Sequence, residues 1–137
     1  MMVHSDSLKS LYIGESREMN WYLSALKKSF VFKGRARRKE YWYFALFNIL
    51  ISLFIGYIDI LTPTTDMRAV VGFYIIVMLI PSISVGVRRL HDTNRTGWWY
   101  FITLIPIIGG IVLFVFMVLD SDNSENQFGD NPKLQVE

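Results

Sequence analysis

The chain has 137 residues, which is the size of a single domain. Hydrophobic residues make up 52% of it and the formal net charge is only +2, so the overall charge selects no particular class of partner. Cysteine is absent, which excludes disulfides, thiolate metal sites and a cysteine nucleophile.

The first thirty residues are polar and mixed in charge. They lack the basic start and the apolar centre of a cleavable signal peptide, so we expect the apolar segments that follow to remain in the mature protein. Within this part of the chain, residues 1–18 are expected to be disordered.

Residues 19–33 favour an amphipathic helix that lies in the membrane interface. On a helix, the aromatic and aliphatic residues from Trp21 to Phe30 fall on one face, and Lys27 and Lys28 fall on the opposite face. An ordinary packed helix is the alternative. Gly34 then predicts a bend before a basic cluster that leads into the first apolar run.

Three apolar runs are long enough to cross a membrane, since a spanning helix needs about 20 residues. They cover residues 41–61, 69–87 and 98–119, and Asp59 is the only acidic or basic residue in them. Helices of a soluble bundle would carry a polar stripe at helical spacing, and these runs have none. We therefore predict an all-α polytopic membrane protein with three transmembrane helices and the N-terminal interfacial helix. Pro106 is expected only to kink the third span.

The distribution of lysine and arginine predicts the orientation, because cytoplasmic loops carry an excess of both. With three spans, residues 1–40 and the loop 88–97 share one side and carry twelve basic residues, against two on the other side. We therefore expect a cytoplasmic N-terminus. The acidic polar tail, residues 120–137, then lies outside as a solvated segment, unless one run turns back instead of crossing.

Two arginine clusters flank the first two predicted spans on their cytoplasmic side. The guanidinium group binds phosphate through two parallel hydrogen bonds, so we interpret the clusters as one contact site for an anionic lipid headgroup or an acidic protein partner. In the alternative interpretation they only fix the orientation. Nucleic acid is not expected so close to the bilayer, and self-association of the spans is left open. The candidate residues are Arg35, Arg37, Arg38, Arg88, Arg89, Arg95, His91 and Asp92.

No set of residues predicts catalysis, a bound metal or a cofactor. A metal-dependent phosphohydrolase would need more ligands than the pair His91 and Asp92, and His4 is the only other histidine. We therefore expect a non-enzymatic protein without a cofactor. A small transporter or channel component is the alternative function, because Asn48 and Asp59 are polar residues inside the first span.

Three blocks of the sequence resemble a known family. The blocks "FKGRARRKEYW", "IPSISVGVRRLHDTNRTGWW" with "LIPIIGG", and "NQFGDNP" follow in this order at fitting spacing. Together they resemble the YhaH/YhaI-like bacterial inner-membrane proteins, the domain of unknown function 805 family, and most closely its YhaH-type members, over roughly residues 20–133. The resemblance implies a small polytopic protein of the bacterial cytoplasmic membrane.

The resemblance brings no reaction and no catalytic residues. Members of this family commonly have a glycine-bearing turn before the terminal motif, where this chain has "LDSDNSEN". The likeness of the terminal block to the two cytoplasmic blocks also favours a cytoplasmic tail, against the count of three spans.

Overall fold

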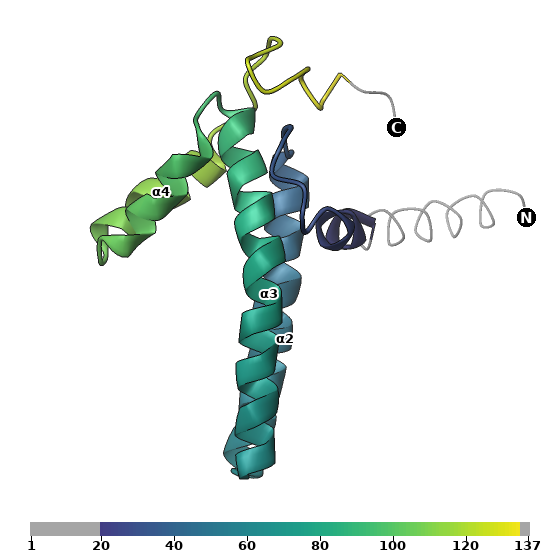
Figure 1. Ribbon diagram of the computed structural model, residues 1–137, viewed down its shortest axis with the longest axis vertical. Coiled ribbons are helices and arrows are strands. Elements are labelled where there is room, and N and C mark those ends of the chain that lie inside the picture. The colour runs from purple at the N-terminus through teal and green to yellow at the C-terminus, as the bar shows by residue number, and fades with distance from the viewer. Residues whose placement is uncertain (1–19, 135–137) are drawn as a thin grey trace, which may run out of the picture.

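Two long antiparallel helices form a rod that dominates the structure (Figure 1). The computed structural model describes residues 20–134. Helix α2 extends over Arg38–Leu61 and helix α3 over Thr65–Asp92, and a short turn between them reverses the chain. Thr64 fixes this turn, because its hydroxyl accepts a hydrogen bond from the Met67 N–H at 3.1 Å and so caps the first turn of α3.

The middle and the far end of this rod are apolar and largely uncovered. Only 6% of the most apolar 18-residue window of α2 is buried, and only 22% of that of α3. A core helix of a soluble bundle would be enclosed by its neighbours, so length, composition and exposure all suit these two helices to cross a membrane. The helices contain the first two predicted spans, 41–61 and 69–87.

Helix α3 is longer than the second predicted span, because it continues past Val87. Residues 88–92 were expected in a loop; they form the last turns of the helix instead, and this expectation is corrected. Arg89 and Asp92 are three residues apart and face each other, so their ion pair stabilises the final turn. The connection that remains is the short segment 93–96.

The third apolar run, residues 98–119, does not form the continuous spanning helix that the sequence predicts. It is divided into a 3-10 helix, η1, over Gly97–Leu104 and a short helix, α4, over Ile108–Val118. Pro106 has no N–H to continue a helix, and its ring excludes the carbonyl group four residues earlier. Ile107 follows with a φ of 68°, which turns the chain back. The predicted third span is therefore corrected to a broken segment of two short arms.

The two arms lie side by side as a second hairpin that projects away from the α2–α3 rod (Figure 1). Their backbones come into contact, because a Cβ atom built on Gly109 would lie 1.7 Å from the carbonyl oxygen of Ile102. Only glycine fits at such a close approach. At the neighbouring Gly110, a Cβ atom would meet nothing within 4 Å. The chain thus enters and leaves this hairpin at the same end of the molecule.

The apolar core is confined to the end of the rod where the other segments meet it. Residues 20–27 form a helix that lies across the rod (Figure 1), and residues 28–30 turn the chain toward α2. This helix ends at Lys27, before the predicted end of the interfacial helix at residue 33, and the predicted disordered residues 1–18 lie outside the described residues. One buried cluster joins it to α2 and α3 and another joins α3 to α4: Ala25, Ala36, Phe44 and Val85, then Leu90, Leu113 and Met117.

The contact between the two short arms can be tested by adding one methyl group. Gly109→Ala is expected to destabilise the hairpin by about 3 kcal/mol, since an overpacked site must shift its backbone. Gly110→Ala is the matched control and is expected to be neutral or stabilising by up to about 1 kcal/mol, because alanine favours a helix more than glycine does. The melting temperatures of the two variants in detergent measure the difference. Equal melting temperatures would contradict the close packing of η1 and α4.

Candidate functional site

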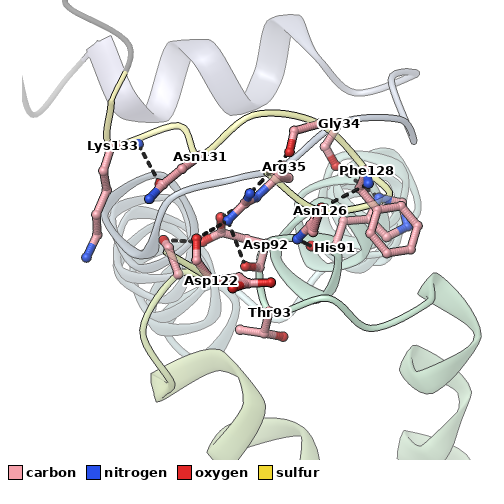
Figure 2. Close-up of polar contacts among 12 residues, drawn as sticks. Gly34, Arg35, His91, Asp92, Thr93, Asp122, Asn126, Phe128, Asn131 and Lys133 are labelled. Atoms are coloured by element: carbon pink, nitrogen blue, oxygen red, sulfur yellow. Dashed lines mark hydrogen bonds and ion pairs between the residues drawn. The ribbon is translucent and has the colours of Figure 1, made fainter. Parts of the chain in front are cut away.

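Arg35 is the centre of a buried polar cluster at the core end of the rod (Figure 2). Gly34, with a φ of 88°, bends the chain just before it and so directs Arg35 beneath the C-terminal segment. The Nε atom donates to Asp92 Oδ1 at 3.0 Å. The Nη1 and Nη2 atoms donate to four main-chain carbonyl oxygens at 2.6 to 3.2 Å, those of Asp92, Asp122, Ser124 and Gly129. An arginine has five N–H donors, and here five bonds use all of them.

Asp92 is the shared counter-ion of two buried arginines. Its Oδ2 atom accepts from Arg89 Nη1 at 2.5 Å and from the Ser121 hydroxyl at 2.5 Å, and the carboxylate is completely buried. Arg89 also donates to the carbonyl oxygens of Met117 and Leu119 at the end of α4. One carboxylate therefore balances two guanidinium groups only because main-chain carbonyls supply the remaining acceptors.

A second buried ion pair links α2 to α3. Arg88 Nη1 donates to Glu40 Oε1 at 2.7 Å, and the two side chains are 1% and 5% exposed. The carbonyl oxygen of Arg88 also accepts from the Ala36 N–H at 2.9 Å. The loop before α2 is therefore attached to the last turns of α3 by its backbone as well as by side chains.

His91 attaches both the N-terminal loop and the C-terminal segment to α3. Its Nδ1 atom donates to the Gly34 carbonyl oxygen at 2.9 Å, which requires a proton on Nδ1. The imidazole ring stacks on Phe128, with ring centroids 3.9 Å apart and planes inclined by 3° (Figure 2). Asn126 Nδ2 donates to the His91 carbonyl oxygen at 3.0 Å. This histidine has a structural role in the cluster.

The C-terminal segment is folded over the cluster. The sequence predicts a solvated tail from residue 120, and for the described residues 120–134 this expectation is corrected. Asp122 N–H donates to the Asp92 carbonyl oxygen at 2.8 Å, and Asn126 and Gly129 exchange main-chain hydrogen bonds across a tight turn. Asn131 Nδ2 closes the segment on itself by donating to the Asn123 carbonyl oxygen at 3.2 Å.

The remaining predicted arginines lie around the cluster. Arg37 is placed over the Trp21 ring, 5.3 Å from its centroid, and Arg95 over the Phe116 ring at 4.2 Å. Arg38 is about half exposed and pairs with Asp120 at 3.3 Å. Five of the eight candidate residues thus come together in the buried cluster, and three do not: Arg35, Arg88, Arg89, His91 and Asp92 against Arg37, Arg38 and Arg95.

Asp120 holds the C-terminal segment from its exposed side. Its carboxylate accepts from Lys133 Nζ and from the Ser121 N–H, and it faces Arg38. These groups, with Lys133 first, hold the pKa of Asp120 below its ordinary value. The contacts therefore persist at neutral pH, and they are lost only as the pH falls into the acid range and the carboxylate takes up a proton.

The sequence interpretation missed several members of the cluster. Glu40 is absent from the eight candidate residues, whereas the structure shows its bond to Arg88. The contributions of Ser121, Asn126 and Phe128 were not foreseen. Their only sequence signal is the turn-forming composition of "NQFGDNP", in which asparagine and glycine favour a tight turn.

The geometry of the cluster is that of a structural clasp. Both carboxylate oxygens of Asp92 accept hydrogen bonds from protein donors, and His91 is held on both its ring face and its Nδ1 atom. Among residues 20–134, no three histidine, aspartate or glutamate side chains gather where they could hold a metal ion. Arg35 and Arg89 direct their hydrogen bonds to protein acceptors, whereas the Nε and Nη2 atoms of the buried Arg88 have no hydrogen-bond partner among the described residues.

The sequence is similar to proteins of the bacterial inner membrane. Residues 29–130 match the family described as protein of unknown function (DUF805). Inner membrane protein YhaH of Escherichia coli K12 is 41% identical over 120 residues, which cover 85% of this chain and 99% of YhaH. Inner membrane protein YhaI of the same strain is 38% identical over 116 residues, which cover 85% and 98%.

The uncharacterized protein YiiR of that strain is more distant. It is 34% identical over 82 residues, and the match covers 56% of this chain and 51% of YiiR. No solved structure matches the chain. The higher identity to YhaH than to YhaI agrees with the resemblance drawn from the sequence blocks.

The role of Arg35 can be tested by a substitution that keeps its charge. Lysine has three donors, so Arg35→Lys leaves at least two of the five acceptor contacts unmade, at about 1–3 kcal/mol for each buried acceptor. We expect the C-terminal segment to detach and limited proteolysis within residues 120–134 to accelerate by tenfold or more, on the order of that energy. Arg38→Lys is the matched control, because Arg38 is half exposed. Equal cleavage rates in both variants would show that charge alone holds the segment.

Proposed function

This chain belongs to the DUF805 family, and from that premise we propose that it is a two-span protein of the bacterial inner membrane that binds anionic lipids at the cytoplasmic leaflet without catalysing a reaction. The names of the similar proteins YhaH and YhaI support the membrane. The length and the exposed apolar sides of α2 and α3 support two crossings.

The second hairpin supports a re-entrant segment. At about 2.0 Å per residue in η1 and about 1.5 Å in α4, each arm is about 16 Å long, roughly half of a 30 Å hydrocarbon core. Irregular backbone at membrane depth must satisfy its own polar groups. At the turn, the N–H groups of Ile105, Ile108 and Gly109 donate to carbonyls inside the hairpin, and Pro106 has no N–H.

The re-entrant arrangement increases the difference in basic residues between the two sides of the membrane. The N-terminal region, the connection 93–96 and the C-terminal segment then share one side of the membrane. That side carries the twelve basic residues counted from the sequence together with Lys133, and the opposite side carries only Arg68. Such an excess supports a cytoplasmic location for the buried cluster and for both ends of the chain.

The observation that carries the proposal is an exposed surface of lysines around aromatic side chains. Phe30 is 80% exposed, in the turn that follows the helix 20–27, and Phe32, just after the turn, is 43% exposed. Lys27, Lys28 and Lys33 are exposed in the same stretch. A surface of this kind places aromatic rings at the headgroup boundary and ammonium groups at the phosphates, each basic residue adding on the order of 1 kcal/mol toward anionic lipid.

The proposal of a non-enzymatic role is supported by the contacts that the candidate polar side chains make within the protein. The acidic and imidazole groups that were weighed for catalysis make structural contacts: Asp92 with two arginines, and His91 with Phe128 and Gly34. Asn48, one of the two polar residues that suggested transport, accepts from the Tyr74 hydroxyl at 2.7 Å and so joins α2 to α3, whereas the Oδ1 atom of Asp59, the other, is buried without a hydrogen-bond partner among the described residues. These contacts leave lipid binding as the function best supported by the geometry.

The topology can be tested with single cysteines, because the native chain has none. Pro63→Cys is expected to react with an impermeant maleimide applied outside intact spheroplasts. Thr96→Cys and Glu125→Cys are expected to react only after permeabilisation. All three sites are exposed, so differences in labelling report their side of the membrane. Labelling of Glu125→Cys from outside would show that the third apolar segment crosses the membrane.

The lipid proposal can be tested by charge removal on one side. The triple variant Lys27→Gln, Lys28→Gln and Lys33→Gln is expected to retain at least tenfold less phosphatidylglycerol relative to phosphatidylcholine after mild detergent extraction, from about 1 kcal/mol for each lysine. Arg68→Gln is the control, because it removes a cation at the opposite end of the rod. Lipid mass spectrometry of the purified protein measures the ratio. No preference for phosphatidylglycerol in the unmodified protein would refute the proposal.

A further inference from the structure

A groove runs along α2 beside the end of α4. Its volume is about 360 Å³, and its walls come from the first three turns of α2 and from the last residue of α4. The residues that line it are Arg38, Lys39, Trp42, Tyr43, Leu46 and Val118. The groove is separate from the buried cluster, which uses other side chains.

The lining changes in character along the groove. Arg38, Trp42 and Leu46 are spaced by four residues, so they follow one another down one face of α2 over about 12 Å. Cations therefore stand at one end of the groove, an aromatic ring lies in the middle and an aliphatic side chain lies at the other end. Trp42 is held in place, because its Nε1–H donates to the Met117 carbonyl oxygen at 3.3 Å and its ring packs edge-on against Phe114.

We propose that this groove binds one anionic phospholipid, with the phosphate between Arg38 and Lys39 and the first part of an acyl chain along Trp42 and Leu46. This inference rests on the proposed function and adds to it a specific site, apart from the surface of lysines and aromatic side chains in residues 27–33. Two cations at one end of the groove select an anion, and arginine can bind a phosphate through two hydrogen bonds. The apolar walls below select a ligand that carries a hydrocarbon chain, which a free phosphate does not.

Asp120 is the internal competitor of this lipid. Its carboxylate lies 3.3 Å from Arg38 Nη2 in a pair whose side chains are 44% and 55% exposed. An ion pair so open to solvent is weak, so a lipid phosphate can replace the carboxylate on Arg38. Asp120 also accepts from Lys133 and remains paired when Arg38 turns to the lipid. Lipid binding thus removes one of the contacts that hold the C-terminal segment.

The test is a titration of the full chain in detergent with dioleoylphosphatidylglycerol, followed by native mass spectrometry. Leu46→Trp fills the groove and is expected to weaken binding at least fivefold, about the loss expected for one contact of moderate strength. Leu79→Trp is its matched control on α3, since the two leucines are 50% and 55% exposed. Arg38→Gln is expected to weaken binding about fivefold, and Asp120→Asn is expected to strengthen it.

Two results separate this inference from the proposed function. If Leu46→Trp and Leu79→Trp bind equally while the unmodified protein still prefers phosphatidylglycerol to phosphatidylcholine, the groove is not the site and the wider lipid proposal stands. If that preference is absent, both fail. Glycerol 1-phosphate serves as the chain-free probe, and binding as tight as that of the lipid would overturn the assignment of an acyl chain. Melting temperatures equal to that of the unmodified protein confirm that the variants are folded.

Discussion

The complete satisfaction of Arg35 is the constraint on which the arrangement of the chain depends. A buried guanidinium group that loses its partners is strongly destabilising, by about 3–5 kcal/mol when one member of a buried pair is removed. Arg35, which lies in the loop before α2, avoids this only where the end of α3 and the C-terminal segment both supply acceptors. Three segments far apart in the sequence must therefore meet at one point. Asp92 strengthens the meeting, because the same carboxylate also binds Arg89 and Ser121.

This buried cluster explains why the buried side chains are concentrated at one end of the molecule. Away from it, α2 and α3 bury few side chains, and lipid offers no hydrophobic force to press two helices together. Polar contacts must then fix their register, as Glu40 with Arg88 does near the clasp and Asn48 with Tyr74 does farther along. In the second hairpin the register of η1 and α4 is fixed differently, because Gly109 lets the two backbones come into contact. The polar contacts therefore hold the buried cluster together, and the apolar helices that extend from it are left exposed.

The sequence predicts the parts of the fold that depend on composition, and it fails where one backbone torsion angle or a distant backbone group decides the structure. Two long helices and the bend at Gly34 are read directly from apolar length and from glycine. Pro81 and Pro106 look equivalent in the sequence, yet α3 continues through Pro81 while the chain reverses after Pro106. The sequence predicts that the two arginine clusters lie together, but not that Arg35, Arg88 and Arg89 are buried. Main-chain carbonyls balance the charge of Arg35, and every residue has one, so no residue type marks the acceptors.

The separation of buried from exposed cations decides which residues are informative about function. Arg35 and Arg38 are three residues apart in one basic cluster, but Arg35 belongs to the loop beneath the C-terminal segment and Arg38 begins α2. A substitution of Arg35 changes the fold of the buried cluster. Any loss of bound lipid that follows would therefore not show that Arg35 contacts the lipid. Arg38 reaches the surface, and its partners, the Asp120 carboxylate and the Val118 carbonyl oxygen, are exposed, so its loss disturbs the fold less than the loss of Arg35 does. One basic cluster in the sequence thus contains a buried arginine that stabilises the fold and an exposed arginine that can bind a ligand. Burial, which the sequence does not display, tells them apart.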